Sequence, residues 1–143
     1  MKVNAKFLAV FGVILVLLAG LSGCLPVQKA GLTDQQVASL TENILKALDN
    51  NNYPAFTRDL SPQMKSAFPQ DKFSQLRTMI YTASGNFGYL DAPSLSNNQG
   101  YAVYRFPCKY ANETVTVTIT FVVGGQEVEG LWFDSANLRK VSQ

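Results

Sequence analysis

Few of the residue types that commonly carry out catalysis occur in this chain. It contains no histidine, which removes the commonest general base and nucleophile-activating partner. Glu127 and Glu129 alternate along one predicted strand and are the nearest approach to a carboxylate pair, but we interpret them as two solvated charges. No glycine-rich phosphate loop and no serine nucleophile-elbow motif occurs. We therefore expect no metal site and no cofactor, and we do not expect an enzyme.

The first of the two cysteines ends the tetrapeptide Leu-Ser-Gly-Cys at residues 21–24. It follows a positively charged start, with Lys2 and Lys6, and an unbroken apolar run over residues 7–21. Because this run is short for a lasting transmembrane helix, the arrangement is typical of a secretory signal. The tetrapeptide resembles the lipobox of prokaryotic lipoprotein precursors, which are cut just before the cysteine and carry lipid on its thiol. The resemblance implies lipid on Cys24 and a location at the cell membrane, facing outside the cytoplasm. An ordinary signal peptide and an uncleaved anchor helix are the alternatives.

The chain divides into a signal peptide over residues 1–23, a lipidated N-terminus and short tether over 24–32, and a single domain over 33–143. Removing Lys2 and Lys6 from the twelve basic residues leaves ten, equal to the ten acidic ones. No basic stripe is present, so we expect no nucleic-acid partner. With Cys24 lipidated, Cys108 has no partner in the chain, and we expect a small buried apolar residue there. An intermolecular disulfide is the alternative.

Helical periodicity is confined to the first half of the domain. Thr33 and Gln36 form a capping box before an amphipathic helix that ends at the asparagines 50–52. Ser61 precedes a proline and predicts the start of a further helix. Residues 71–83 carry apolar side chains at helical spacing and are followed by a glycine. These segments predict a layer of helices.

Strand patterns fill the second half. Residues 113–123 alternate threonine with valine, isoleucine and phenylalanine, which predicts a half-buried strand on the order of 34 Å long. Residues 101–110 form a second strand, 126–133 another, and 87–95 an irregular one interrupted by Pro93. The expected fold class is therefore α+β, with N-terminal helices packed on a curved four-stranded antiparallel sheet.

Several loose motifs resemble those of an uncharacterised domain found in prokaryotic lipoproteins and secreted proteins. They are Asn-Asn-Tyr-Pro-Ala-Phe at 51–56, Asp-Leu-Ser at 59–61, Met-Lys at 64–65, Phe73, and Gly-Leu-Trp-Phe at 130–133. That domain is similar to the nuclear transport factor 2-like, or cystatin-like, superfamily, whose sheet wraps a long helix to form a cone. The resemblance covers residues 33–133 and implies a fold without an activity.

A cone-shaped fold can enclose a pocket at its open end, and the domain is rich in aromatic residues. The candidate lining residues are Tyr81, Phe87, Tyr104, Phe106, Trp132 and Phe133. The alternative is that these side chains fill the core and leave no cavity. The leading functional hypothesis is a non-catalytic binding or interaction module with a small apolar ligand or a protein partner.

The superfamily also implies an alternative function. Some of its members resemble ketosteroid isomerase and use a buried aspartate base with a tyrosine donor, so a small-molecule isomerase or dehydratase is the second hypothesis. By residue type alone, the candidates are Tyr81, Tyr89, Tyr104, Asp91 and Asp134. Their spacing matches no such enzyme.

Two surface features complete the expectations. The even-numbered threonines 114–120 form a polar strand face that could pair in a homodimer, although a hydrated sheet face is the alternative. Asn112, Glu113 and Thr114 fit an N-glycosylation acceptor, with Asn112 as the modified residue.

Overall fold

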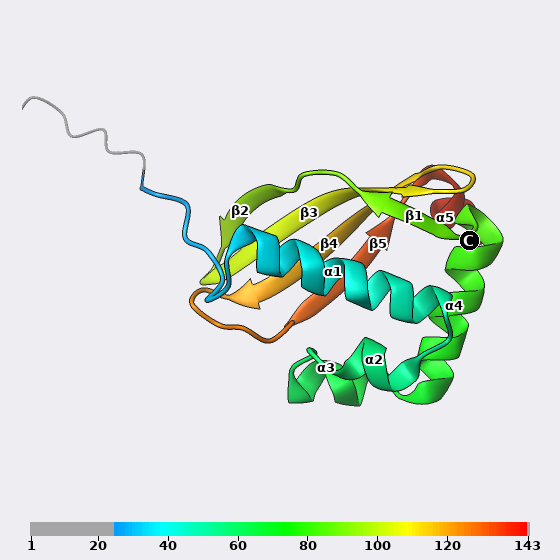
Figure 1. The fold of residues 1–143 in the computed structure, drawn as a ribbon, viewed down its shortest axis with the longest axis horizontal. Coiled ribbons are helices and arrows are strands. Elements are labelled where there is room, and N and C mark those ends of the chain that lie inside the picture. Colours follow the sequence, from blue (N-terminus) through cyan, green and yellow to red (C-terminus); the bar gives the residue numbers. More distant parts are fainter. Residues whose placement is uncertain (1–24, 143) are drawn as a thin grey trace, which may run out of the picture.

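The order of the elements is four helices, then an antiparallel sheet, then one short helix (Figure 1). The structure is a computed structural model that describes residues 25–142, so the predicted signal peptide and Cys24 lie outside the described residues. The helices are α1 (Asp34–Asp49), α2 (Tyr53–Thr57), α3 (Pro62–Ala67), α4 (Gln70–Ser84) and α5 (Ala136–Val141). The strands are β1 (Phe87–Leu90), β2 (Ser94–Asn98), β3 (Tyr101–Tyr110), β4 (Thr114–Val122) and β5 (Gly130–Asp134). The predicted α+β class is confirmed.

The helix boundaries follow from local hydrogen bonds that the sequence predicted. At the start of α1, the Thr33 hydroxyl accepts a bond from the Gln36 N–H, and the Gln36 side chain accepts one from the Thr33 N–H. Asn52 caps α2, and Ser61 caps α3 ahead of a proline. Gly85 ends α4 with a φ of 78°, a conformation that favours glycine.

The sheet has the order β1-β3-β4-β5, and β2 also pairs with β3. The predicted irregular strand over 87–95 is therefore two short strands, which lie one after the other along the same edge of β3. The gap between them lies opposite Pro107, which has no N–H to donate, and the Asp91 N–H donates to the Pro107 carbonyl across it at 2.8 Å. The sheet thus has five strands, one more than expected.

The last part of the sheet differs from the expectation in two ways. The predicted strand over 126–133 begins only at Gly130. Before it, Val128 pairs instead with the segment between α2 and α3: its N–H donates to the Asp59 carbonyl and its carbonyl accepts from the Ser61 N–H, both at 2.9 Å. Helix α5 was not predicted. Both features lie next to β5, the strand at one edge of the sheet, and the candidate site described below lies beside this strand.

The core lies between α1 and the inner face of the sheet, which α1 crosses in Figure 1. The odd-numbered residues of β4 are fully buried, as the alternation predicted: Val115, Val117, Ile119 and Phe121. Val37, Ile44 and Leu45 of α1 are equally buried. Cys108 is also buried, as expected, and burial raises the pKa of its thiol to about 12. Within residues 25–142, no helix is both long and apolar enough to cross a membrane.

Candidate ligand-binding groove

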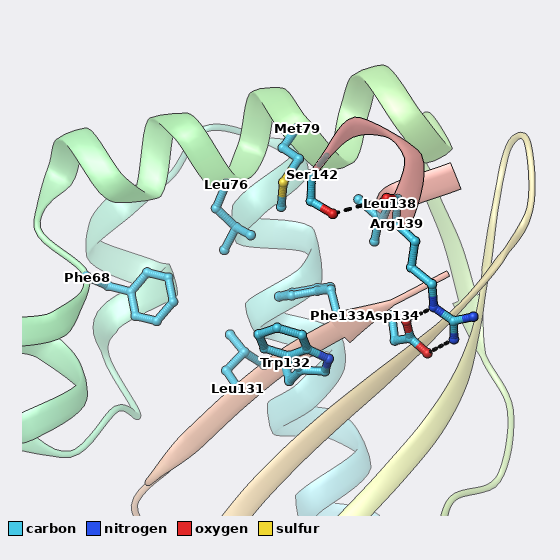
Figure 2. Close-up of a pocket in the computed structure, with 10 residues that line it drawn as sticks. All are labelled: Phe68, Leu76, Met79, Leu131, Trp132, Phe133, Asp134, Leu138, Arg139 and Ser142. Atoms are coloured by element: carbon cyan, nitrogen blue, oxygen red, sulfur yellow. Dashed lines mark hydrogen bonds and ion pairs between the residues drawn. The ribbon is translucent and has the colours of Figure 1, made fainter. Parts of the chain in front are cut away.

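A groove of about 210 Å³ lies between α4, β5 and α5 (Figure 2). Most of its lining is aliphatic or aromatic, with one ion pair and one hydroxyl at the α5 end. The lining residues are Phe68, Leu76, Met79, Leu131, Trp132, Phe133, Asp134, Leu138, Arg139 and Ser142. Apolar walls with a few polar groups at one end are the usual composition of a small-molecule site.

Helix α4 forms one wall of the groove. Leu76 and Met79 are three residues apart, so they share a helix face, and in Figure 2 both point toward β5. Phe73 and Ile80 of the same helix are buried in the core. Helix α4 therefore packs part of its apolar surface and presents the rest to the groove.

The edge strand β5 forms the opposite wall. Among the described strands it pairs only with β4, so no strand covers its other side. Phe133 is buried and Leu131 half-buried, whereas Trp132 is 68% exposed. An exposed tryptophan beside an apolar hollow supplies a large amphipathic contact surface.

Helix α5 closes one end. Ser135 caps it, and Leu138 is its buried residue. Asp134 and Arg139 form an exposed ion pair at this end of the groove (Figure 2), and the hydrogen bond from Arg139 lowers the pKa of the Asp134 carboxyl. This pair is the polar end of an otherwise apolar groove.

Glu113 holds α5 in place from the turn before β4. Its carboxylate accepts hydrogen bonds from the Ser84 hydroxyl at 2.6 Å, the Ser135 hydroxyl at 2.7 Å and the Asn137 N–H at 3.2 Å. Burial alone would raise the pKa of Glu113, but these three bonds outweigh it and hold the pKa below its ordinary value. One carboxylate thus joins the end of α4, the β3–β4 turn and the start of α5.

Of the six predicted lining residues, two line the groove and four do not. Trp132 and Phe133 are part of it. Tyr104 and Phe106 are buried in the core on β3. Tyr81 is exposed on α4, and Phe87 is half-buried on β1 against Tyr110.

The walls contributed by α4 and α5 do not follow from the sequence pattern. The apolar periodicity over residues 71–83 predicts a packed helix face, and periodicity does not distinguish a core contact from a groove wall. For α5, the available signal is Ser135, which fits an N-cap pattern three residues before Leu138.

The isomerase-type candidates are dispersed. Asp134 is the sole carboxylate among the groove residues, and no tyrosine lines it. Tyr89 and Asp91 are exposed at the opposite edge of the sheet.

A half-buried acid and a buried tyrosine lie away from the groove. Burial raises the pKa of Asp49, whose carboxylate accepts a hydrogen bond from the Phe87 N–H at 2.9 Å. Burial also raises the pKa of Tyr110, whose hydroxyl has no hydrogen-bond partner among the described residues. Neither residue lines the groove.

A second hollow, of about 400 Å³, lies beside α1 and the end of α2. Its lining is largely amide, hydroxyl and charged: Leu32, Thr33, Gln35, Gln36, Ser39, Leu40, Asn43, Arg58 and Asp59. Arg58 and Asp59 pair with each other there. It offers less apolar surface to a ligand than the groove does, so the groove is the better candidate.

The remaining surface predictions lie outside the groove. Asn112 is exposed in the β3–β4 turn, and its N–H donates to the Ser84 carbonyl at 3.0 Å. The threonine face of β4 is half-buried, with Thr118 paired in register with Arg105 on one side and Trp132 on the other. Glu129 is half-buried and Glu127 exposed. Within residues 25–142, no three potential metal-ligating side chains come together.

Comparison with known proteins identifies a family for this chain. No curated protein matches the chain. A family model described as "Protein of unknown function (DUF3887)" matches residues 41–131, from the second turn of α1 into β5. The matched range includes the α4 wall of the groove, with Leu76 and Met79, and ends just before Trp132. Because the match spans more than half of the chain, the protein belongs to this family of uncharacterised domains.

Proposed function

We propose that the protein is a membrane-anchored extracytoplasmic binding module, without catalytic activity, whose groove holds a small apolar ligand. The observation that carries the proposal is the apolar groove between α4, β5 and α5, with the exposed Trp132 at its side. Burying such surface against a ligand removes apolar area from water, which is favourable by roughly 25 cal/mol per Å².

The size and lining of the groove define the ligand class. Its volume of about 210 Å³ lies below the range of roughly 300–1,000 Å³ usual for drug-sized ligands. The ligand is therefore small, or a larger molecule inserts one apolar segment. The Asp134–Arg139 pair at one end suits a polar group at the end of an apolar chain.

The anchor rests on the sequence around Cys24, with its charged start, apolar run and lipobox-like tetrapeptide. The order of helices followed by an antiparallel sheet, with α1 across the inner face, supports placing the domain in the nuclear transport factor 2-like superfamily. Two acyl chains suffice for stable membrane retention.

The anchor is tested with Cys24→Ser. We expect this variant to leave the membrane fraction or to accumulate as uncut precursor, whereas Cys108→Ser, at the buried cysteine, should be processed normally. Normal processing and unchanged membrane retention of Cys24→Ser would show that the protein is not a lipoprotein.

The groove is tested with anilinonaphthalene sulfonate, an apolar fluorescent probe with one charged group. Trp132 is the sole tryptophan of the chain, so its emission reports binding directly. Met79→Glu places a negative charge in the groove, which disfavours an apolar ring and repels the sulfonate, and should weaken probe binding about tenfold or more. Tyr81→Glu, two residues along the same helix and exposed, is the matched control and should bind as the unchanged chain does. Equal binding by all three proteins would place the probe elsewhere.

An isomerase or dehydratase is the alternative function. It needs a desolvated acid beside a tyrosine, and Asp49 with Tyr110 is the pair that burial favours. The binding proposal predicts that ligand in the groove leaves the Asp49 pKa unchanged in an NMR titration. A shift of that pKa on ligand binding would favour the enzyme instead.

A further inference from the structure

The chain makes its first hydrogen bonds to the sheet at Gln28, well before the start of helix α1. The Asn97 side chain at the end of β2 accepts a hydrogen bond from the Gln28 N–H and donates one to the Gln28 carbonyl, both at 2.7 Å. Two residues later, Ala30 is buried, and its N–H donates to the Tyr104 hydroxyl at 3.3 Å. The segment before α1 is therefore packed on the sheet from Gln28 onward.

The loop between β4 and β5 holds the same segment from the other side. The Gly124 N–H donates to the Lys29 carbonyl at 3.0 Å. The Gly31 N–H donates to the Gly125 carbonyl at 2.7 Å. A side chain on Gly31 would overlap the Gly124 carbonyl oxygen, at 2.3 Å, so glycine is required for this close approach. Because residues 28–31 are held by these bonds, only the few residues before Gln28 can act as a tether, and not the whole of the expected range 24–32.

Four exposed apolar side chains lie on this segment and on the strand ends that it reaches, and we call them the N-terminal patch. Tyr101 and Val122 are paired in register on β3 and β4 and are 41% and 45% exposed. Leu25 and Val27, just before Gln28, are 90% and 53% exposed. Asn97 also donates to the Tyr101 carbonyl, at 3.3 Å, which links the two pairs. Figure 1 shows the segment reaching the sheet where β2 and β4 end and β3 begins.

The one charged side chain of residues 25–31 is in an ion pair. Lys29 pairs with Asp34 at 2.7 Å. The turn between β2 and β3 presents the uncharged side chains of Asn98 and Gln99. Tyrosine beside aliphatic residues and neutral amides suits the boundary between lipid headgroups and acyl chains.

We propose that the N-terminal patch rests on the membrane that holds the lipid on Cys24. This inference rests on the proposed anchor. Gln28 is four positions after Cys24, so even a fully extended chain reaches only about 14 Å, and the patch cannot move far from the lipid surface. The lipid supplies the affinity, and the patch fixes the orientation of the domain.

The orientation determines where the groove points. Glu113, which holds α5, precedes β4, and Val122 of the patch ends it. The nine residues of β4 span about 30 Å at roughly 3.4 Å each. The α5 end of the groove, with its ion pair, therefore faces away from the membrane.

The test uses the full, lipidated chain in phosphatidylcholine vesicles with brominated acyl chains, which quench tryptophan on contact. Trp132→Phe removes the native tryptophan, and Tyr101→Trp then places a reporter in the patch. Tyr89→Trp in the same background is the matched control, since Tyr89 is also exposed but lies opposite Lys109, at the other end of β3. We expect the reporter at position 101 to lose about half of its emission, and the reporter at position 89 to lose almost none.

Flotation with the vesicles and quenching of the reporters distinguish a wrong anchor from a wrong orientation. If the chain does not float with the vesicles, the proposed anchor and the proposed orientation are both wrong. If it floats and the two reporters are quenched equally, or position 101 is not quenched, the anchor stands and the orientation is wrong.

Discussion

Helices α1 and α4 are similar in length, with 16 and 15 residues, but they use their apolar faces differently. Helix α1 lies over the inner face of the sheet and buries its stripe completely at Val37, Ile44 and Leu45. Helix α4 stands by the edge strand β5 and leaves Leu76 and Met79 half-buried in a groove. One periodic pattern can therefore either close a core or line a site, depending on whether the opposite surface is a sheet face or a sheet edge.

The largest effect is expected under α1. Phe121→Ala removes a fully buried ring that packs edge-on against Tyr104. The free energy of unfolding should fall by about 3–5 kcal/mol, as measured by urea denaturation. A loss below about 1 kcal/mol would mean that the α1 side is as loosely filled as the α4 side.

A smaller effect is expected where α5 is held over the groove. Glu113→Gln weakens the bonds to Ser84, Ser135 and Asn137. The loss at neutral pH should be about 1 kcal/mol, because the carboxylate is half-exposed and its charge-assisted bonds are partly screened.

The pH dependence sharpens this prediction. The folded-state pKa of Glu113 lies below its ordinary value of 4.5, so its stabilisation is present above that value and is lost as the pH falls through the folded-state pKa. The melting temperatures of the unchanged chain and of Glu113→Gln should therefore converge on acidification. A constant difference from neutral to acid pH would contradict the role of the carboxylate charge.

The smallest effect on stability is expected at the groove itself. Trp132→Ala should change the free energy of unfolding by no more than about 0.5 kcal/mol, because the side chain is exposed. Affinity for an apolar probe, followed by equilibrium dialysis, should fall about tenfold, or about 1.4 kcal/mol. Comparable losses of stability in Phe121→Ala and Trp132→Ala would remove the distinction between the two regions.

The sequence predicted the elements whose ends and faces are set by local physics. Thr33 and Ser61 each satisfy free backbone N–H groups at a helix start, so they were readable from residue type and spacing. The buried face of β4 followed from its alternation in the same way.

The groove was only partly predictable because it depends on tertiary placement. Trp132 was identified by residue type, but its position on an edge strand depends on the strand order. Val128 lies in a segment that the sequence predicted as a strand, but its backbone forms hydrogen bonds with Asp59 and Ser61 instead. Glu113 matched a glycosylation motif, and its contacts with Ser84 and Ser135 join residues 29 and 22 positions away.

The central claim is that the groove binds an apolar ligand of limited size. The most direct test follows Trp132 emission while the chain is titrated with straight-chain alcohols of increasing length. Each added methylene should contribute about 0.8 kcal/mol, about fourfold in Kd, until the groove is full and the gain stops. Met79→Lys should abolish this dependence on chain length, and Tyr81→Lys should preserve it. An affinity that does not depend on chain length, or the same dependence in Met79→Lys, would contradict the claim.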